Sequence, residues 1–378
     1  SLVAAGALPA PGQFLASRSS SDFVSDSFTQ LSRPAVRYQG DFSWGAGQRF
    51  SAGYEWEREH RPERTKPSVV APFTQDTNAF FVQQQFAFQN RWFVTAGIRS
   101  DAKESLETFY SPKLSAGGFL LPARAGTVSS VKVFGNIGHG IKSPNYAERF
   151  GASFADPNPD LKVEQARTAD LGVEATFANQ YVRFAATYFD NSYKDQIAFR
   201  SGVVGDGIPE YINIDGSKAD GWEIEAALQR PVAGFTASGS YSLVDTKVVT
   251  NVSTSQQFQP GQPLLRRPKN SGTIRAGYSL NRVSATFDLR IVGDRHDNSF
   301  LSLRTVPNAE RPTAITTDIT VNPGYAVAGF GIDIRAADQL TVFLRGDNVA
   351  NEAYDSALGY PGSPRAFRAG VRLNLRVQ

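Results

Sequence analysis

Aromatic and cationic side chains cluster in the proline-containing segment 142–167. Planar apolar rings beside guanidinium groups suit a ligand that carries both flat surface and negative charge. The four residues that we assign to ligand binding are Tyr146, Arg149, Phe150 and Phe154. Later polar segments add Arg266, Arg267, Arg295, Arg304 and Arg311, of which we assign Arg267 and Arg295 to the same role. The pattern predicts binding of an anionic ligand. Alternatively, these arginines pair with acidic neighbours or with phosphate groups at a membrane surface.

No residue pattern predicts catalysis or a resident metal ion. His60, His139 and His296 are isolated and lack metal-ligand spacing, and there is no nucleophile elbow or phosphate-binding loop. For His139 we expect a hydrogen bond at the end of a strand. The segments 156–160 and 205–207 combine carboxylates with glycine or proline, which suits a hard cation, but their spacing matches no fixed loop. We interpret both as solvated turns and predict no enzyme activity, no cofactor and no metal.

Composition excludes several classes of protein. The 378 residues include no Cys, so disulfides and thiol chemistry are excluded. With 39 basic and 36 acidic residues, the net charge of +3 gives no basic excess for nucleic-acid binding. No apolar run approaches the ~18 residues of a transmembrane helix. No intact signal peptide is visible, and we interpret the chain as a mature or truncated product.

The segment 365–378 alternates between apolar and polar residues. Its apolar positions are Phe367, Ala369, Val371, Leu373, Leu375 and Val377, and the positions between them include Arg368, Arg372 and Arg376. This period of two is typical of a strand with one apolar and one wet face. Three arginines on one face cannot lie in a closed core without partners. They suit the polar lumen of a large barrel whose other face meets lipid, although an edge strand of a soluble sandwich also alternates.

Similar strands follow one another from Ala35 onward, about fifteen in all. The predicted strands are 36–44, 50–56, 78–88, 92–101, 110–121, 131–141, 168–177, 181–199, 211–229, 234–244, 271–279, 282–293, an irregular region ending near 335, 340–348 and 365–378. Connectors alternate between short and long, and many strands are longer than those of soluble sandwiches. We therefore predict an all-β fold, a transmembrane antiparallel β-barrel over residues 35–378, preceded by a weakly structured segment 1–34 with at most one strand.

An odd number of strands is informative because bacterial single-chain barrels need an even number. The last predicted strand begins after a long connector and ends on the short-turn side. An open edge in lipid would leave a row of unpaired backbone groups. We therefore expect either that the chain is a C-terminal piece of a longer protein or that another chain completes the barrel.

Several phrases resemble the TonB-dependent outer-membrane receptor family. They are Tyr110–Ser115, Ile141–Tyr146, Asn158–Lys162 with Glu164, Asp215-Gly216 followed by Gly221–Glu225, Arg267-Pro268 with Asn270, Asp347-Asn348 with Tyr354, and Gly359–Gly362 with Arg365. Each phrase is weak alone, but their order and spacing extend over most of residues 35–378. The sequence departs from the pattern of this family in three places. These are Val349–Asn351, the longer segment Pro361–Arg365, and the final Gln378, where such barrels usually end in an aromatic residue.

The resemblance implies a twenty-two-stranded barrel in the bacterial outer membrane, with a plug domain inside it and a periplasmic TonB complex as energy source. The fifteen strands would be the eighth to the last, the C-terminus would be periplasmic, and the plug would lie on missing N-terminal sequence or another chain. Lipid and lipopolysaccharide would surround the barrel. The implied function is uptake of a metal chelate such as a siderophore, of cobalamin or of a similar bulky solute. The alternative is a structural barrel subunit of a surface assembly without transport activity.

Overall fold

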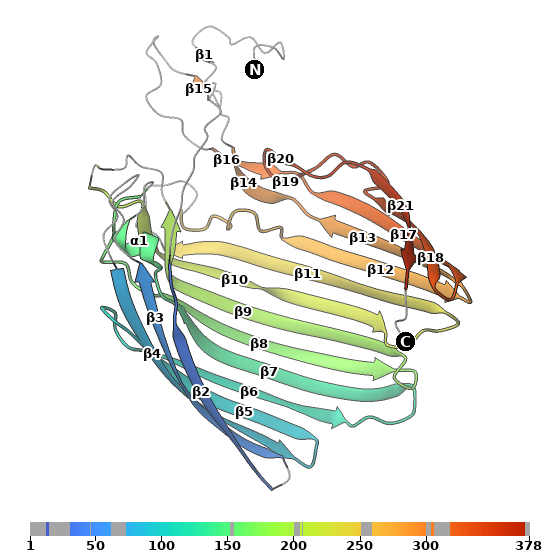
Figure 1. The fold of residues 1–378 in the computed structure, drawn as a ribbon, viewed down its shortest axis with the longest axis horizontal. Helices are drawn as coiled ribbons and strands as arrows, with labels where there is room; N and C mark the ends of the chain where they lie inside the picture. The colour runs from blue at the N-terminus through green and yellow to red at the C-terminus, as the bar shows by residue number, and fades with distance from the viewer. Residues whose placement is uncertain are drawn as a thin grey trace.

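Fifteen strands form one continuous antiparallel sheet (Figure 1). The computed structural model describes residues 13–14, 31–45, 47–61, 73–151, 155–199, 205, 207–250, 259–299, 304–305 and 318–374. The strands of this sheet are β2 (Ala35–Trp44), β3 (Gln48–Arg61), β4 (Phe73–Phe88), β5 (Trp92–Lys103), β6 (Phe109–Leu121), β7 (Val128–Lys142), β8 (Glu164–Phe177), β9 (Val182–Phe199), β10 (Tyr211–Leu228), β11 (Phe235–Thr250), β12 (Asn270–Leu280), β13 (Val283–Val292), β17 (Tyr325–Ala337), β18 (Leu340–Asp347) and β21 (Ala366–Leu373). The predicted all-β class and strand count are confirmed.

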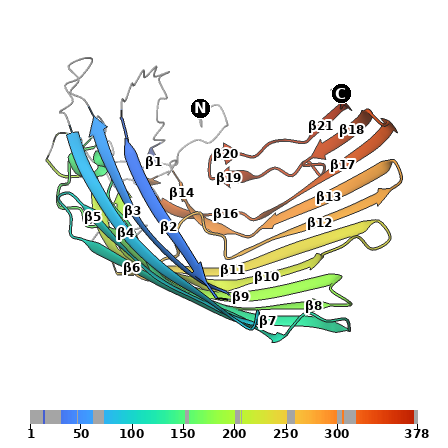
Figure 2. The same cartoon turned by 60° about the horizontal axis from the view of Figure 1, so that its bottom comes forward.

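The sheet curves into a trough with β2 and β21 at its two edges (Figure 2). Neighbouring strands in the sheet are neighbours in sequence, except that β13 pairs with β17 and β18 pairs with β21. Each strand therefore needs only local connections, which is the up-and-down arrangement of membrane barrels. No helix among the described residues is long and apolar enough to cross a membrane.

The two faces of the sheet differ in polarity. Large apolar side chains are exposed on the convex face, among them Phe80 and Val82 on β4 and Phe367 and Val371 on β21. The alternate positions face the concave side and carry ion pairs, such as the 2.6 Å contact between Arg345 Nη2 and Asp333 Oδ2. A face of exposed aromatic and aliphatic side chains fits contact with hydrocarbon, and a charged concave wall fits a hydrated lumen.

Connector length separates the two ends of the sheet. At one end the strands turn tightly, for example through Asn281 (φ 53°) between β12 and β13 and through Gln89 and Asn90 between β4 and β5. Left-handed backbone in a short hairpin matches the twist of the paired strands. Trp44 and Trp92 both lie beside short turns at this end. The strand β21 also ends here, because Leu373 pairs with Leu340.

The long connectors contain short elements that the alternation of the sequence does not indicate. These are the helix α1 (Tyr146–Phe150), the pair of β14 (Arg295–Ser299) with β16 (Asp318–Asn322), the hairpin β19 (Asp355–Ala357) with β20 (Tyr360–Pro361), and β15 (Arg304–Thr305), which pairs with β1 (Gln13–Phe14) from the segment before the sheet. The strands also extend further into the long-connector end than we predict, since β3 reaches Arg61 and β8 begins at Glu164. At this end the strands remain paired through their backbones beyond the residues that alternate between apolar and polar. Most of the predicted weak segment 1–34 lies outside the described residues.

Candidate functional site

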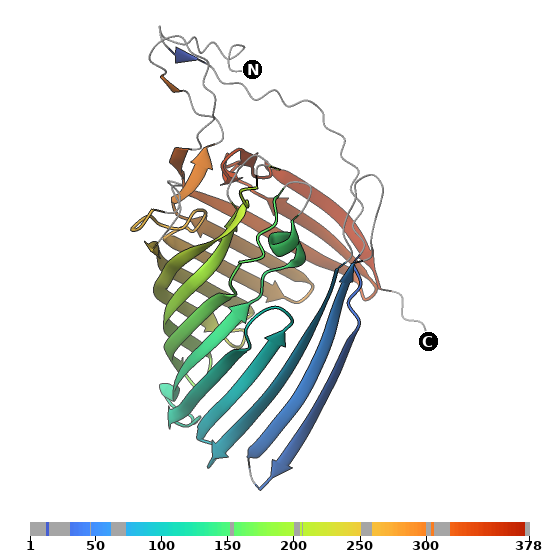
Figure 3. The same ribbon diagram turned by 90° about the vertical axis from the view of Figure 1, so that its left-hand side faces the viewer.

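The helix α1 lies among the long connectors at one end of the sheet (Figure 3). Asn145 forms its N-cap, with Asn145 Oδ1 accepting from the Glu148 amide at 3.1 Å and Glu148 Oε2 accepting from the Asn145 amide at 2.7 Å. This capping box satisfies two backbone donors that a helix start otherwise leaves unpaired. It fixes a single turn of helix in a connector rich in proline, and thereby fixes the directions of Tyr146, Arg149 and Phe150.

We expect the substitution Asn145→Ala to weaken this turn by about 1 kcal/mol, because an N-cap side chain contributes about that much to helix stability. The Glu148 amide donates to the Asn145 side chain, so its hydrogen exchange should become faster in Asn145→Ala. The amides of β4 should stay protected. Asn145→Ser, which keeps a capping oxygen, is the matched control. Equal protection in the alanine and serine variants would contradict a capping role.

Two aromatic side chains of α1 pack against the ends of β3 and β4, and we call the four residues the aromatic cluster: Arg61, Phe73, Tyr146 and Phe150. The Phe73 ring lies 4.5 Å from the Tyr146 ring and 4.9 Å from the Phe150 ring, measured between centroids. The Arg61 guanidinium lies 3.6 Å from the Tyr146 ring centroid and donates to the Tyr146 hydroxyl. Burial raises the pKa of Tyr146, and the nearby Arg61 charge opposes this shift. The Phe150 side chain stays 38 % exposed and available for contact.

Arg149 has a different environment from its neighbours in α1. It is only 7 % exposed and donates from Nη2 to the Pro159 carbonyl at 3.0 Å and to the Ser105 carbonyl at 3.4 Å. Its Nε and Nη1 atoms have no hydrogen-bond partner among the described residues. Burial lowers the pKa of this guanidinium, and the Asp160 carboxylate opposes that effect. Arg149 therefore ties the connector to the β5–β6 loop and does not present a free charge at the surface.

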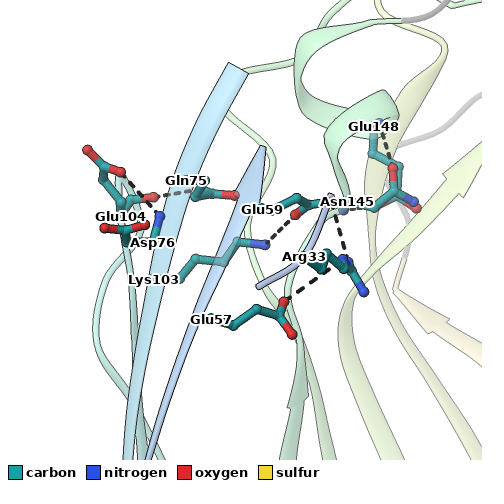
Figure 4. A network of polar contacts seen from close by, with 9 residues as sticks. All are labelled: Arg33, Glu57, Glu59, Gln75, Asp76, Lys103, Glu104, Asn145 and Glu148. Carbon is teal, nitrogen blue, oxygen red and sulfur yellow. Dashed lines mark hydrogen bonds and ion pairs between the residues drawn. The ribbon is translucent and has the colours of Figure 1, made fainter. Parts of the chain in front are cut away.

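An acid–base network lies near α1 on the ends of β2, β3 and β5 (Figure 4). Glu59 is 5 % exposed and lies 3.4 Å from Arg33 Nη2 and 3.9 Å from Lys103 Nζ. Arg33 also lies 3.9 Å from Glu57. Buried carboxylates need such cations, since an unpaired buried charge is costly. The network links the ends of three strands beside the aromatic cluster and holds these strand ends in place.

A second group of loops is joined through Arg295 at the start of β14. Arg295 is 4 % exposed and donates to the carbonyls of Pro323 (3.2 Å), Ser356 (3.0 Å) and Asp355. Two residues later, the fully buried Asp297 accepts from Arg266 Nε at 2.8 Å and from the Leu358 amide at 2.7 Å. We call Arg295, Asp297 and these partners the Arg295 cluster. It binds the β14–β16 pair to the β19–β20 hairpin.

Comparison with known proteins identifies the family of the chain. The family model described as TonB dependent receptor-like, beta-barrel matches residues 5–349. The chain belongs to this family. Proteins of the TonB-dependent receptor family lie in the bacterial outer membrane. The resemblance in the ordered phrases is thereby confirmed.

Individual relatives of this TonB-dependent receptor barrel are distant. Vitamin B12 transporters of Vibrio cholerae serotype O1 are 22% identical over 323 residues, which is 85% of this chain and 46% of theirs. Among solved structures, a siderophore receptor of Acinetobacter baumannii has a TM-score of 0.67 at 15% identity, covering 91% of this chain and 54% of that one. An iron transporter of Neisseria meningitidis has a TM-score of 0.66 at 15% identity, with 91% and 55% covered. The chain spans about half the length of the relatives it matches.

In this receptor barrel the predicted ligand-binding residues fall into separate groups. Tyr146, Arg149 and Phe150 come together at α1, whereas Arg295 lies in the Arg295 cluster with its guanidinium held by carbonyls. Arg267 is exposed beside Arg266. Phe154 lies outside the described residues, as does Arg311. Sequence reasoning did not assign roles to Arg61, Phe73 or Asp297, and no local pattern marks them, because their partners are distant in the chain.

The two segments with cation-like composition meet through hydrogen bonds. The Asp156 carboxylate accepts from the amides of Gly205 (2.9 Å) and Gly207 (3.1 Å), and Glu210 Oε2 accepts from the Asp156 amide at 2.6 Å. Within the described ranges, no group of three His, Cys, Asp or Glu side chains is arranged for a metal ion. His139 Nδ1 lies 3.2 Å from the Tyr110 carbonyl, in line with the expected hydrogen bond at a strand end.

Proposed function

We propose that this chain is the barrel portion of an outer-membrane receptor that takes up a metal chelate such as a siderophore, cobalamin or a similar bulky solute with energy from TonB. The observation that carries the proposal is the fifteen-stranded curved sheet with exposed apolar side chains on its convex face and ion pairs on its concave face. A sheet of this width borders a space far wider than the interior of a small barrel. Relatives named as vitamin B12 transporters and siderophore receptors support the solute class.

The proposed orientation in the membrane is based on connector length. Outer-membrane barrels have short periplasmic turns and long extracellular loops. On this basis α1 and the Arg295 cluster face the outside of the cell, and the C-terminus, which follows β21 at the short-turn end, is periplasmic. Lipid contacts the convex face, and lipopolysaccharide contacts its outer rim. This arrangement puts the exposed Phe150 and Arg267 where an incoming solute arrives first.

A plug domain and the TonB complex are the proposed protein partners. The concave wall carries balanced charge, for example Arg183, whose guanidinium lies 2.8 Å from both Glu174 and Glu225 on adjacent strands. Such a wall offers hydrogen bonds and ion pairs to a folded domain inside the barrel and little apolar surface to hold it permanently. That combination suits a plug that must rearrange when TonB acts.

The aromatic cluster is the proposed first contact for the solute. Phe150 and Tyr146 supply planar surface, and Arg267 supplies accessible charge. Phe154 remains a contact proposed from the sequence alone. Arg149 and Arg295, both more than nine-tenths buried, act by positioning the connectors that carry these contacts. We expect the double substitution Tyr146→Ala and Phe150→Ala to weaken solute binding about tenfold, as the loss of two ring contacts of roughly 0.5–1.5 kcal/mol implies.

The test uses the full-length protein in a strain that lacks its chromosomal copy. Growth on defined iron and cobalamin sources, with and without a functional TonB complex, identifies the solute and its energy source. Tyr181→Ala is the matched control, because Tyr181 is also 38 % exposed but lies at the short-turn end. A strain that takes up every tested solute equally well without the protein, while losing a surface assembly, would replace the transport proposal with the structural one.

A further inference from the structure

A cavity of about 400 Å³, with serine, threonine and arginine side chains in its lining, lies on the sheet near the Arg295 cluster, away from the aromatic cluster. Its walls come from β11, β12, β13 and β17 together with the connectors before β12 and after β13. The residues that matter to the argument are Ser240, Thr273, Arg266, Arg290, Arg295 and Tyr325. Ser240, Thr273 and Arg290 share the concave face, since Ser240 pairs with Thr273 and Thr273 pairs with Arg290 in the strand register.

Hydroxyl groups form one wall of the cavity. On β11 the alternate residues Ser238, Ser240 and Ser242 share the concave face, and two of them line the cavity. Ser240 Oγ and Thr273 Oγ1 lie 2.7 Å apart and hydrogen-bond across the strands. Each hydroxyl has one proton and two lone pairs, so this pair retains capacity for a further partner. Ser271 on β12 adds another hydroxyl next to Ser242 in the register.

Guanidinium groups line the cavity next to these hydroxyls and are held in fixed positions. Arg266 is anchored through Nε by the buried Asp297, which leaves the rest of its side chain 45 % exposed. Arg290 donates to the Tyr325 hydroxyl, and the guanidinium carbons of Arg290 and Arg295 lie 5.6 Å and 5.4 Å from the Tyr325 ring centroid. Tyr354 stacks on Tyr325 at 4.2 Å between centroids. Preorganised guanidinium forks lose little freedom when they bind an anion.

The charge of the described lining is strongly one-sided. It contains three arginines and no carboxylate, and Asp297 lies behind Arg266 as its partner. Other arginines of the concave wall have carboxylate partners on neighbouring strands, as Arg183 has with Glu174 and Glu225. A cavity with hydroxyl donors, fixed guanidinium forks and unbalanced positive charge matches an oxyanion.

We propose that this cavity binds a carboxylate or phosphate group of the transported solute, with Arg266 and Arg290 as the anion-binding forks and the hydrogen-bonded pair Ser240 and Thr273 supplying one further hydroxyl donor. The inference rests on the proposed function for the source of the anion. Because the cavity belongs to the concave face, it meets a solute inside the barrel, whereas lipopolysaccharide phosphate meets the convex side. The aromatic cluster and this cavity then hold two chemically different parts of one solute.

The test measures binding of citrate and of inorganic phosphate to the full-length protein in detergent by calorimetry, with glycerol as the uncharged probe. We expect the double variant Arg266→Gln, Arg290→Gln to bind the favoured anion ten- to a hundredfold more weakly, as expected when charge-assisted hydrogen bonds are lost. Preference for citrate assigns a carboxylate solute, and preference for phosphate assigns a phosphorylated one. The control is Arg275→Gln, a concave-face arginine on β12 that does not line the cavity.

Several outcomes would overturn the inference. These are unchanged anion binding in the double variant, equal weakening in Arg275→Gln, or a loss restricted to binding of lipopolysaccharide vesicles. If the double variant lacks the heat-modifiable electrophoretic mobility of a folded barrel, the variant Ser240→Ala, Thr273→Val decides instead, and it should weaken binding severalfold. Anion binding that follows these expectations without any TonB-dependent uptake would keep this inference and remove the proposed function.

Discussion

The substitution Val82→Arg is expected to destabilise the membrane-inserted barrel by about 2–4 kcal/mol, the cost of an arginine on the lipid face near the middle of a membrane strand. Val82 lies near the middle of β4, is 43 % exposed on the convex face and pairs with Ala52 and Ile98. All three side chains are apolar, so an arginine here finds no partner on neighbouring strands. Its charge must either remain in hydrocarbon or deform the bilayer around it.

The neighbouring substitution Gln83→Arg is the matched control. Gln83 is next in β4, faces the concave side, and pairs with Ser51 and Gly97. The free energy of unfolding of the Gln83→Arg variant should stay within about 0.5 kcal/mol of that of the unmodified protein, as for an exposed polar site. Urea unfolding of the full-length protein in lipid vesicles measures both. Equal effects of the two substitutions would mean that both faces of the sheet meet water, which contradicts a membrane barrel.

The sheet could be predicted from the sequence because the pattern that specifies each strand lies within that strand. In β21, Phe367, Val371 and Leu373 are exposed on one face and Arg368 on the other contacts Asp347 at 2.5 Å, as the alternation in the sequence indicates. After β2, every strand of the sheet except β17 and β21 pairs with the strand before it in the chain, so identifying the strands was nearly enough to order them. The longest connector lies between β13 and β17, and there the sequence predicts only an irregular strand region ending near 335.

The site was predicted less well because its contacts are not local. Tyr146 and Arg61 are 85 positions apart, and nothing near either residue in the sequence indicates that they meet. Composition identified the connector that carries the aromatic rings, but it did not separate Arg149, which is buried against carbonyls, from Phe150, which is exposed. Similarly, Arg266 and Arg267 are identical in type, and only the left-handed backbone of Arg266 (φ 59°) and its ion pair with Asp297 distinguish their roles.

Loss of the Arg295 side chain is expected to open the loops at the long-connector end without unfolding the sheet. The substitution Arg295→Ala removes the donor for three carbonyls, from Pro323, Asp355 and Ser356, and leaves them with one fewer partner in a buried site. Each buried polar group that loses its partner costs about 1–3 kcal/mol, so the local opening free energy should fall by about 3 kcal/mol or more. Native-state hydrogen exchange reports such local opening directly.

The Leu358 amide, which donates to Asp297, and the Gly359 amide, which donates to Asp355, are the reporters. Their exchange should become about a hundredfold faster in Arg295→Ala, since 3 kcal/mol corresponds to a factor of that order. Amides of β12 should keep their protection, and Arg267→Ala, which removes an exposed arginine nearby, should change neither set. Because Asp297 also anchors Arg266, the same variant should weaken anion binding in the cavity even though Arg266 and Arg290 are intact. Unchanged protection at Leu358 would show that Asp297 and the two strand pairs hold these loops without Arg295.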